Sequence, residues 1–118
     1  MTTVTVIGNI AQDPELRYTA SGKAVCNMRV LENRRRKNDN GEWVDDTPLV
    51  WPVTVWDDAA ANAYDALSKG DRVVVIGSIT QQPYETAEGY TVQQTAITAK
   101  EVARSVRFAP KAAEPPAE

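Results

Sequence analysis

Several stretches of the chain alternate between apolar and polar positions with a period of two residues, a pattern typical of half-buried β-strands. The first stretch, residues 3–10, is rich in valine, threonine and isoleucine, which favour strands. Further stretches with strand character lie at residues 23–32, 47–56, 73–79 and 90–102. Residues 58–69 are rich in alanine, begin at an aspartate N-cap (Asp57 or Asp58) and end at Gly70. They predict one helix between the third and fourth strands.

Three strands, one helix and two strands are the element order of a small oligonucleotide-binding (OB) barrel. We therefore predict an all-β fold, a five-stranded Greek-key OB-fold barrel with one short helix between strands three and four. A chain of 118 residues is long enough for one domain, and we expect residues 1–108 to form it. Residues 109–118 are rich in proline and alanine and predict a disordered tail.

Two polar stretches interrupt the strands and predict long exposed hairpin loops at residues 33–46 and 81–89. The first contains four consecutive cationic side chains, Arg34, Arg35, Arg36 and Lys37. Side chains alternate faces along a strand, so Trp51 and Trp56 lie on opposite faces of the third strand. We expect Trp51 to lie in the core or in a subunit interface.

The composition excludes several classes of function. The chain has no histidine and one cysteine, which removes the commonest general base and any ordinary zinc site. We therefore expect no enzymatic activity, no metal, no cofactor and no small-molecule substrate. Cys26 lies in an apolar strand and is predicted to be a buried, inert thiol. The net charge of −3 does not favour nucleic acid, but the distribution of charge matters more than its sum.

The chain carries no signal for a membrane or for secretion. No apolar run approaches the roughly 18 residues that span a bilayer, and the first ten residues lack a charged region ahead of an apolar one. We expect a cytoplasmic protein without a membrane partner.

Several motifs together resemble the bacterial single-stranded DNA-binding protein family (SSB). They extend over about residues 3–108 and comprise VIGNI at 6–10, DPELRY at 13–18, AVCN at 24–27, GEW at 41–43, VW at 55–56 and KGDRV at 69–73. Residues 105–108 (SVRF) are similar to an extra C-terminal clamp strand of actinobacterial members. The resemblance implies sequence-independent binding and protection of single-stranded DNA in replication, recombination and repair. It also implies a homotetramer, a dimer of dimers, associated with the nucleoid.

The same resemblance implies which side chains contact DNA. Trp56 and Tyr84 match family aromatics that stack on bases, and Lys69 matches a basic residue after the helix. Stacking contributes about 1–3 kcal/mol per base, and cations on phosphates make binding salt-dependent. The cationic block stands where many members have another aromatic, and Arg29 adds a charge on the second strand. The predicted DNA-binding residues are Arg29, Arg34, Arg35, Arg36, Lys37, Trp56, Lys69 and Tyr84.

The sequence also departs from the family pattern. Val50 stands where many members have tryptophan, residues 80–83 are neutral where basic residues are common, and Asp58 stands near a frequent lysine. We therefore expect a lower affinity per subunit. The tail lacks the acidic tip with a terminal aromatic that recruits partner proteins in the family. We expect no recruitment of partners through this tail.

Two other functions fit the same fold. One is a tail-less primosomal accessory protein, which binds DNA and a helicase loader as a dimer; the clamp-like segment at residues 105–108 counts against it. The other is a protein-interaction OB module with no nucleic-acid role. The negative net charge favours that module, whereas the cationic block opposes it.

Overall fold

The structure, a computed structural model, describes residues 2–107 of the chain. Its elements, in chain order, are β1 (Thr3–Ile10), β2 (Glu15–Tyr18), β3 (Ala24–Lys37), β4 (Trp43–Trp56), α1 (Asp58–Ala66), β5 (Arg72–Glu85) and β6 (Thr91–Arg104). The prediction of an all-β fold with one short helix is confirmed. The short strand β2 is an addition to the five predicted strands.

Five of the strands form a closed ring. The strand order is β1-β5-β6-β4-β3-β2, and an additional pairing of β1 with β3 joins the two ends of the ring. That pairing is short, because only Asn9 and Ile10 of β1 reach Leu31 and Val30 of β3. The contact of β4 with β6 is parallel and equally short, whereas β2 only extends the edge of β3.

Two glycines permit the closest approaches of the ring. A Cβ atom on Gly8 would collide with the backbone carbonyl of Leu31, next to the β1–β3 pairing. A Cβ atom on Gly77 would collide with the carbonyl oxygen of Thr98, where the β5–β6 register shifts. Any other residue would force the backbones apart at these points, so the two glycines allow neighbouring strands of the ring to pair closely.

The core fills the interior of the ring. Alternate residues of each strand point inward, as the period-2 pattern predicts. The buried side chains are Val6, Ile10, Cys26, Met28, Val30, Val53, Val55, Ala60, Ala63, Val73, Val75, Ala96 and Ile97. Trp51 is half-buried and packs against this cluster, on the face opposite Trp56, which confirms its predicted place on the core side.

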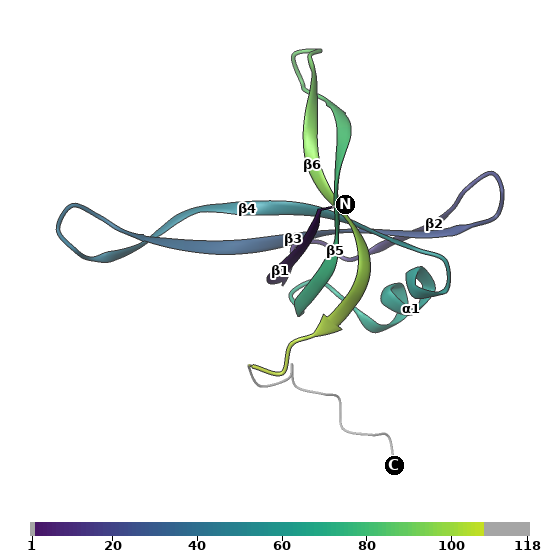
Figure 1. Cartoon of the computed structure of the whole chain (residues 1–118), viewed down its shortest axis with the longest axis horizontal. Coiled ribbons are helices and arrows are strands. Elements are labelled where there is room, and N and C mark those ends of the chain that lie inside the picture. The colour runs from purple at the N-terminus through teal and green to yellow at the C-terminus, as the bar shows by residue number, and fades with distance from the viewer. Residues whose placement is uncertain (1, 108–118) are drawn as a thin grey trace.

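The two predicted hairpins are present, but their loops are shorter than predicted: only residues 38–42 and 86–90 lie outside the strands. Beyond the ring, β3 and β4 remain paired as far as Lys37 and Trp43, and β5 and β6 as far as Glu85 and Thr91. We call residues 33–46 the β3–β4 ribbon and residues 80–96 the β5–β6 ribbon; they project in different directions (Figure 1). Their polar sequences carry no apolar alternation, because both faces of each ribbon meet solvent where it projects beyond the ring.

The helix is shorter than predicted. It ends at Ala66, and Leu67 is already extended and packs against the core. The following turn is held by Asp71, whose carboxylate accepts a hydrogen bond from the backbone N–H of Ser68 (2.9 Å). Ala60 and Ala63 face the core, whereas Tyr64 is 48% exposed. No helix within residues 2–107 is long and apolar enough to cross a membrane.

The clamp strand stays a prediction. Residues 105–107 follow β6 and have no strand pairing of their own in the single chain. The N–H of Ser105 still donates to the carbonyl oxygen of Arg72 (2.8 Å). Phe108 and the predicted tail lie outside the described residues.

We predict that Cys26 resists thiol reagents in the native state. Its side chain is fully buried, and burial raises the pKa of the thiol above its ordinary value. A raised pKa keeps the thiol protonated at neutral pH, and the thiolate is the reactive form. An Ellman titration should find no reactive thiol near pH 7 until denaturant is added. Rapid reaction of the native protein would contradict the burial of this strand.

Candidate nucleic-acid interface

The outer face of the β3–β4 pair is the first part of the candidate site. Because Cys26, Met28 and Val30 point into the core, the intervening residues Asn27 and Arg29 point outward. The register places four pairs on this outer face: Val25 with Trp56, Asn27 with Thr54, Arg29 with Pro52, and Leu31 with Val50. Two of the predicted DNA-binding residues, Arg29 and Trp56, therefore share one face.

Trp56 is open to solvent at one end of this face. It is 40% exposed and borders a hollow of about 390 Å³ that is also lined by Thr19, Ser21, Lys23 and Asp57. An exposed ring beside a cation suits a stacked base and its phosphate. Lys23 was not among the predicted site residues, because it lies 33 positions before Trp56 in the sequence and is brought near it by the pairing of Val25 with Trp56.

A polar groove lies at the middle of the face. It has a volume of about 380 Å³ and is bounded by the β1–β2 connection, β2, the β3–β4 pair and the β5–β6 ribbon. Its lining residues are Gln12, Asp13, Glu15, Asn27, Met28, Arg29, Pro52, Val53, Thr54, Gln82 and Gln94. Of the predicted site residues, only Arg29 lines this groove.

The β5–β6 ribbon continues the groove outward. Gln82 pairs with Gln94, and two residues farther along Tyr84 pairs with Val92. Residues two apart on a strand share a face, so Tyr84 lies on the same side of the ribbon as the groove-lining glutamines. Its ring is 48% exposed. The fold thus arranges Trp56, Arg29 and Tyr84 along one continuous outer surface.

The four side chains of the cationic block do not share one face, because the block lies on strand β3. Arg35 and Lys37 point to one side of the β3–β4 ribbon, and Arg34 and Arg36 to the other. Alternation along β3 places Arg35 and Lys37 on the side of Arg29. Lys37 also lies over the ring of Trp43, with its Nζ 5.4 Å from the ring centre.

Acidic residues of β4 partly neutralise this block. Arg35 Nε lies 3.7 Å from Asp45 Oδ1, and Arg36 Nε lies 3.8 Å from Asp46 Oδ1. Arg34 forms no ion pair within residues 2–107. Exposed ion pairs of this kind contribute about 0–1 kcal/mol, so a phosphate can displace the carboxylates at little cost.

Lys69 follows the helix and is tied to the edge of the polar groove. Its backbone N–H donates to the carboxylate of Asp13 (2.8 Å), and Asp13 is one of the groove residues. The neighbouring Gly70 N–H donates to the carbonyl of Ile10 (2.8 Å). The loop after α1 is thereby fixed beside the groove, which places the lysine nearer to the predicted DNA path than the sequence alone could show.

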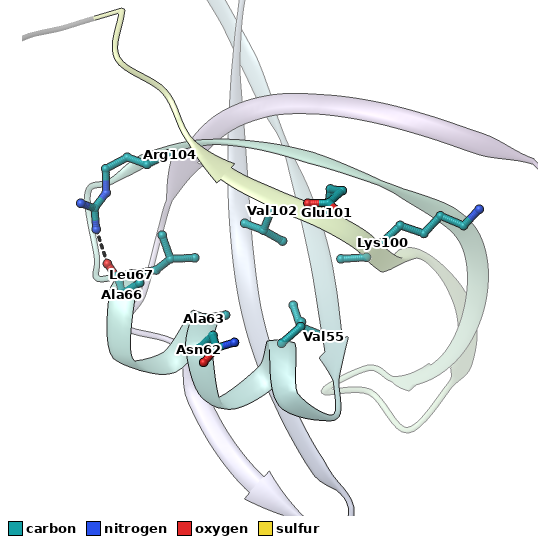
Figure 2. A pocket seen from close by; sticks show the side chains of 11 residues that line it. Val55, Asn62, Ala63, Ala66, Leu67, Lys100, Glu101, Val102 and Arg104 are labelled. Atoms are coloured by element: carbon teal, nitrogen blue, oxygen red, sulfur yellow. Dashed lines mark hydrogen bonds between the residues drawn. The ribbon is translucent and has the colours of Figure 1, made fainter.

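A second hollow of about 530 Å³ lies between α1 and the end of β6, and it contains none of the predicted site residues. Figure 2 shows β6 passing over α1, with Arg104 reaching the carbonyl oxygen of Ala66. Arg104 also lies 3.4 Å from Asp71. These contacts attach the helix to the ring. Within residues 2–107 no group of three potential ligands among His, Cys, Asp and Glu could hold a metal ion.

Comparison with known proteins identifies the family to which the chain belongs. The model of the single-strand binding protein family matches residues 1–105. The chain belongs to this family. Single-stranded DNA-binding proteins of Corynebacterium glutamicum and Mycolicibacterium smegmatis are 45% and 39% identical to it over 109 residues, 92% of this chain. The matches cover 48% and 66% of those relatives, so this chain spans about half to two thirds of their length.

A solved structure shows the same architecture. The small single-stranded DNA-binding protein from Streptomyces coelicolor aligns with a TM-score of 0.75 and 25% sequence identity. The alignment covers 89% of this chain and 94% of that one. The predicted resemblance to the family and to its actinobacterial members is confirmed.

We predict that the two sides of the β3–β4 ribbon contribute unequally to DNA binding. Changing Arg35 and Lys37 to alanine should flatten the log–log salt dependence of oligo(dT) affinity by about 1.4, since each phosphate contact on a single strand contributes about 0.7. The matched double change of Arg34 and Arg36 removes the same charge from the other side and should flatten it less. Equal slopes for both double variants would show that the DNA does not follow one side of the ribbon.

Proposed function

We propose that the chain binds single-stranded DNA with little dependence on sequence and that its role is binding, not catalysis. One observation carries the proposal: the ring aligns two exposed aromatics, Trp56 and Tyr84, with Arg29 between them on one outer surface. Aromatic rings stack on any base, and cations follow the phosphates of the strand. Replication, recombination and repair all open duplex DNA, and a protein that coats the unpaired strands would serve these processes. The proposed place of action is the cytoplasm.

The names of the relatives favour this function over a protein-interaction module or a primosomal accessory protein. Each relative described above is a single-stranded DNA-binding protein. The residues proposed to contact DNA remain Arg29, Arg34, Arg35, Arg36, Lys37, Trp56, Lys69 and Tyr84, and the geometry adds Lys23 beside Trp56.

Binding should distinguish single strands from duplex. A stacked base pair hides both faces of its bases, so Trp56 and Tyr84 can stack only on unpaired DNA. Tryptophan fluorescence should be quenched on titration with oligo(dT) and change little with a hairpin duplex of equal charge. Equal affinity for both ligands would contradict the proposed function.

The contribution of Trp56 to the affinity for single-stranded DNA should not depend on salt concentration. Changing Trp56 to alanine should weaken oligo(dT) binding by roughly 30-fold, the middle of the range for one stacked base, while the salt slope stays the same. Tyr64→Ala is the matched control, because Tyr64 is a similarly exposed aromatic on the helix. An equal loss in both variants would place the DNA elsewhere.

We further propose that the chain assembles as a homotetramer, a dimer of dimers. The edge of β1 supports this proposal. Residues 3–8 of β1 pair with β5 on one side, and β3 pairs on the other side only from Asn9 onward. The remaining edge is free of strand partners within residues 2–107; the exposed Ile7 lies on this edge strand, and the exposed Ile76 lies on the neighbouring strand β5. An open apolar edge is suited to pairing with a second copy.

Light scattering should therefore report about four times the 12.9 kDa chain mass at micromolar concentration. Ile7→Lys places a charge at this edge and should shift the protein toward smaller species. A monomeric wild-type protein would contradict the assembly but not the DNA-binding face.

A further inference from the structure

The polar groove contains carboxylate and amide side chains, which a site for phosphates alone would not require. Its lining combines one cation, Arg29, with the two carboxylate residues Asp13 and Glu15. Four amide side chains complete it, from Gln12, Asn27, Gln82 and Gln94. The groove therefore presents hydrogen-bond acceptors as well as donors.

This mixture fits a nucleobase better than a phosphate. A phosphate offers only acceptors and a negative charge, so Asp13 and Glu15 would repel it. The edge of a base carries donors and acceptors side by side, and amides and carboxylates are the side chains that pair with such edges. The groove also lies between Trp56 and Tyr84 on the outer surface, where bases held by stacking would be presented.

Hydrogen bonds at the groove determine which of its polar groups remain as donors and which as acceptors. Thr54 Oγ1 donates to Asn27 Oδ1 (3.1 Å), which leaves the Asn27 NH₂ group as a donor toward the groove. Glu15 Oε2 accepts from Arg17 (3.2 Å), and its Oε1 is the second acceptor of an exposed carboxylate. The groove thus places an acceptor-only carboxylate on β2 near a donor amide on β3.

We propose that this groove reads the edge of an unpaired base and favours bases with an exocyclic amino group, cytosine over thymine. Cytosine offers its N4 amino group to a carboxylate and its O2 and N3 atoms to a donor amide. Thymine places a carbonyl oxygen, O4, where the amino group would be. The preference modulates a binding that accepts every sequence, and it rests on the proposed single-stranded DNA binding.

Oligo(dC) and oligo(dT) of equal length test this directly, because every base that enters the groove is then the same. We expect Glu15→Gln to lower the ratio of oligo(dC) to oligo(dT) affinity by about threefold, within the range of the net contribution of one hydrogen bond. Glutamine keeps the shape of the side chain but can donate to thymine O4 as well as accept from cytosine.

Glu85→Gln is the matched control. Glu85 follows Tyr84 on β5, points to the opposite side of the ribbon and does not line the groove. Both variants lose one negative charge and should gain the same small overall affinity at low salt, which cancels in the ratio. We expect the ratio of the control variant to equal that of the wild type.

A second pair of variants tests the location. Gln82→Ala with Gln94→Ala removes two groove amides, whereas Gln81→Ala with Gln93→Ala removes two amides from the other side of the same ribbon. Only the groove pair should change the ratio. An unchanged ratio in Glu15→Gln and in the groove pair, or equal changes in the controls, would overturn the inference. If the wild type bound neither oligonucleotide, the proposed function itself would fail.

Discussion

The architecture depends on one short contact, the pairing of Asn9 and Ile10 in β1 with Leu31 and Val30 in β3. Gly8 permits this contact because it has no Cβ to collide with the Leu31 carbonyl. The pairing turns an open sheet into a ring with an enclosed apolar interior. Alternate residues must then point outward, and this places Arg29 and Trp56 on the surface and Cys26 and Val30 inside. The positions of the candidate site residues therefore follow from the closing of the sheet into a ring.

Each ribbon extends a hairpin of the ring into solvent and carries a different part of the proposed interface. The β3–β4 ribbon supplies cations, but Asp45 and Asp46 hold two of them in exposed ion pairs. The β5–β6 ribbon supplies Tyr84 and uncharged amides. In the proposed interface, aromatic stacking and a limited electrostatic attraction therefore both contribute to the binding of DNA. This division agrees with the net charge of −3 and with the carboxylates that face Arg35 and Arg36 in the β3–β4 ribbon.

Much of the fold could be predicted from the sequence, because strands with one buried face, such as Thr3–Ile10, alternate between apolar and polar residues. The helix signal was also readable, although its end at Ala66 depended on how Leu67 packs. The strand character of residues 33–37, 43–46 and 80–85 was missed because strands with two solvated faces need no apolar alternation, whereas the β6 arm lies in the predicted strand 90–102. The site could be predicted in part, since Trp56 and Tyr84 follow from the family resemblance. The proximity of Lys23 to Trp56, and of Gln82 to Asn27, depends on cross-strand register that a single sequence does not display.

The three tryptophans provide the most direct test of the account, because they occupy three distinct environments. Trp56 lies on the proposed DNA surface, and Trp43 lies at the end of the β3–β4 ribbon. The indole Nε1–H of Trp51 donates to Glu32 (3.0 Å) on the opposite face. In a ¹⁵N NMR titration with oligo(dT), the account predicts that the indole signal of Trp56 shifts or broadens while that of Trp51 stays in place. A shift of Trp51 with an unmoved Trp56 would contradict it.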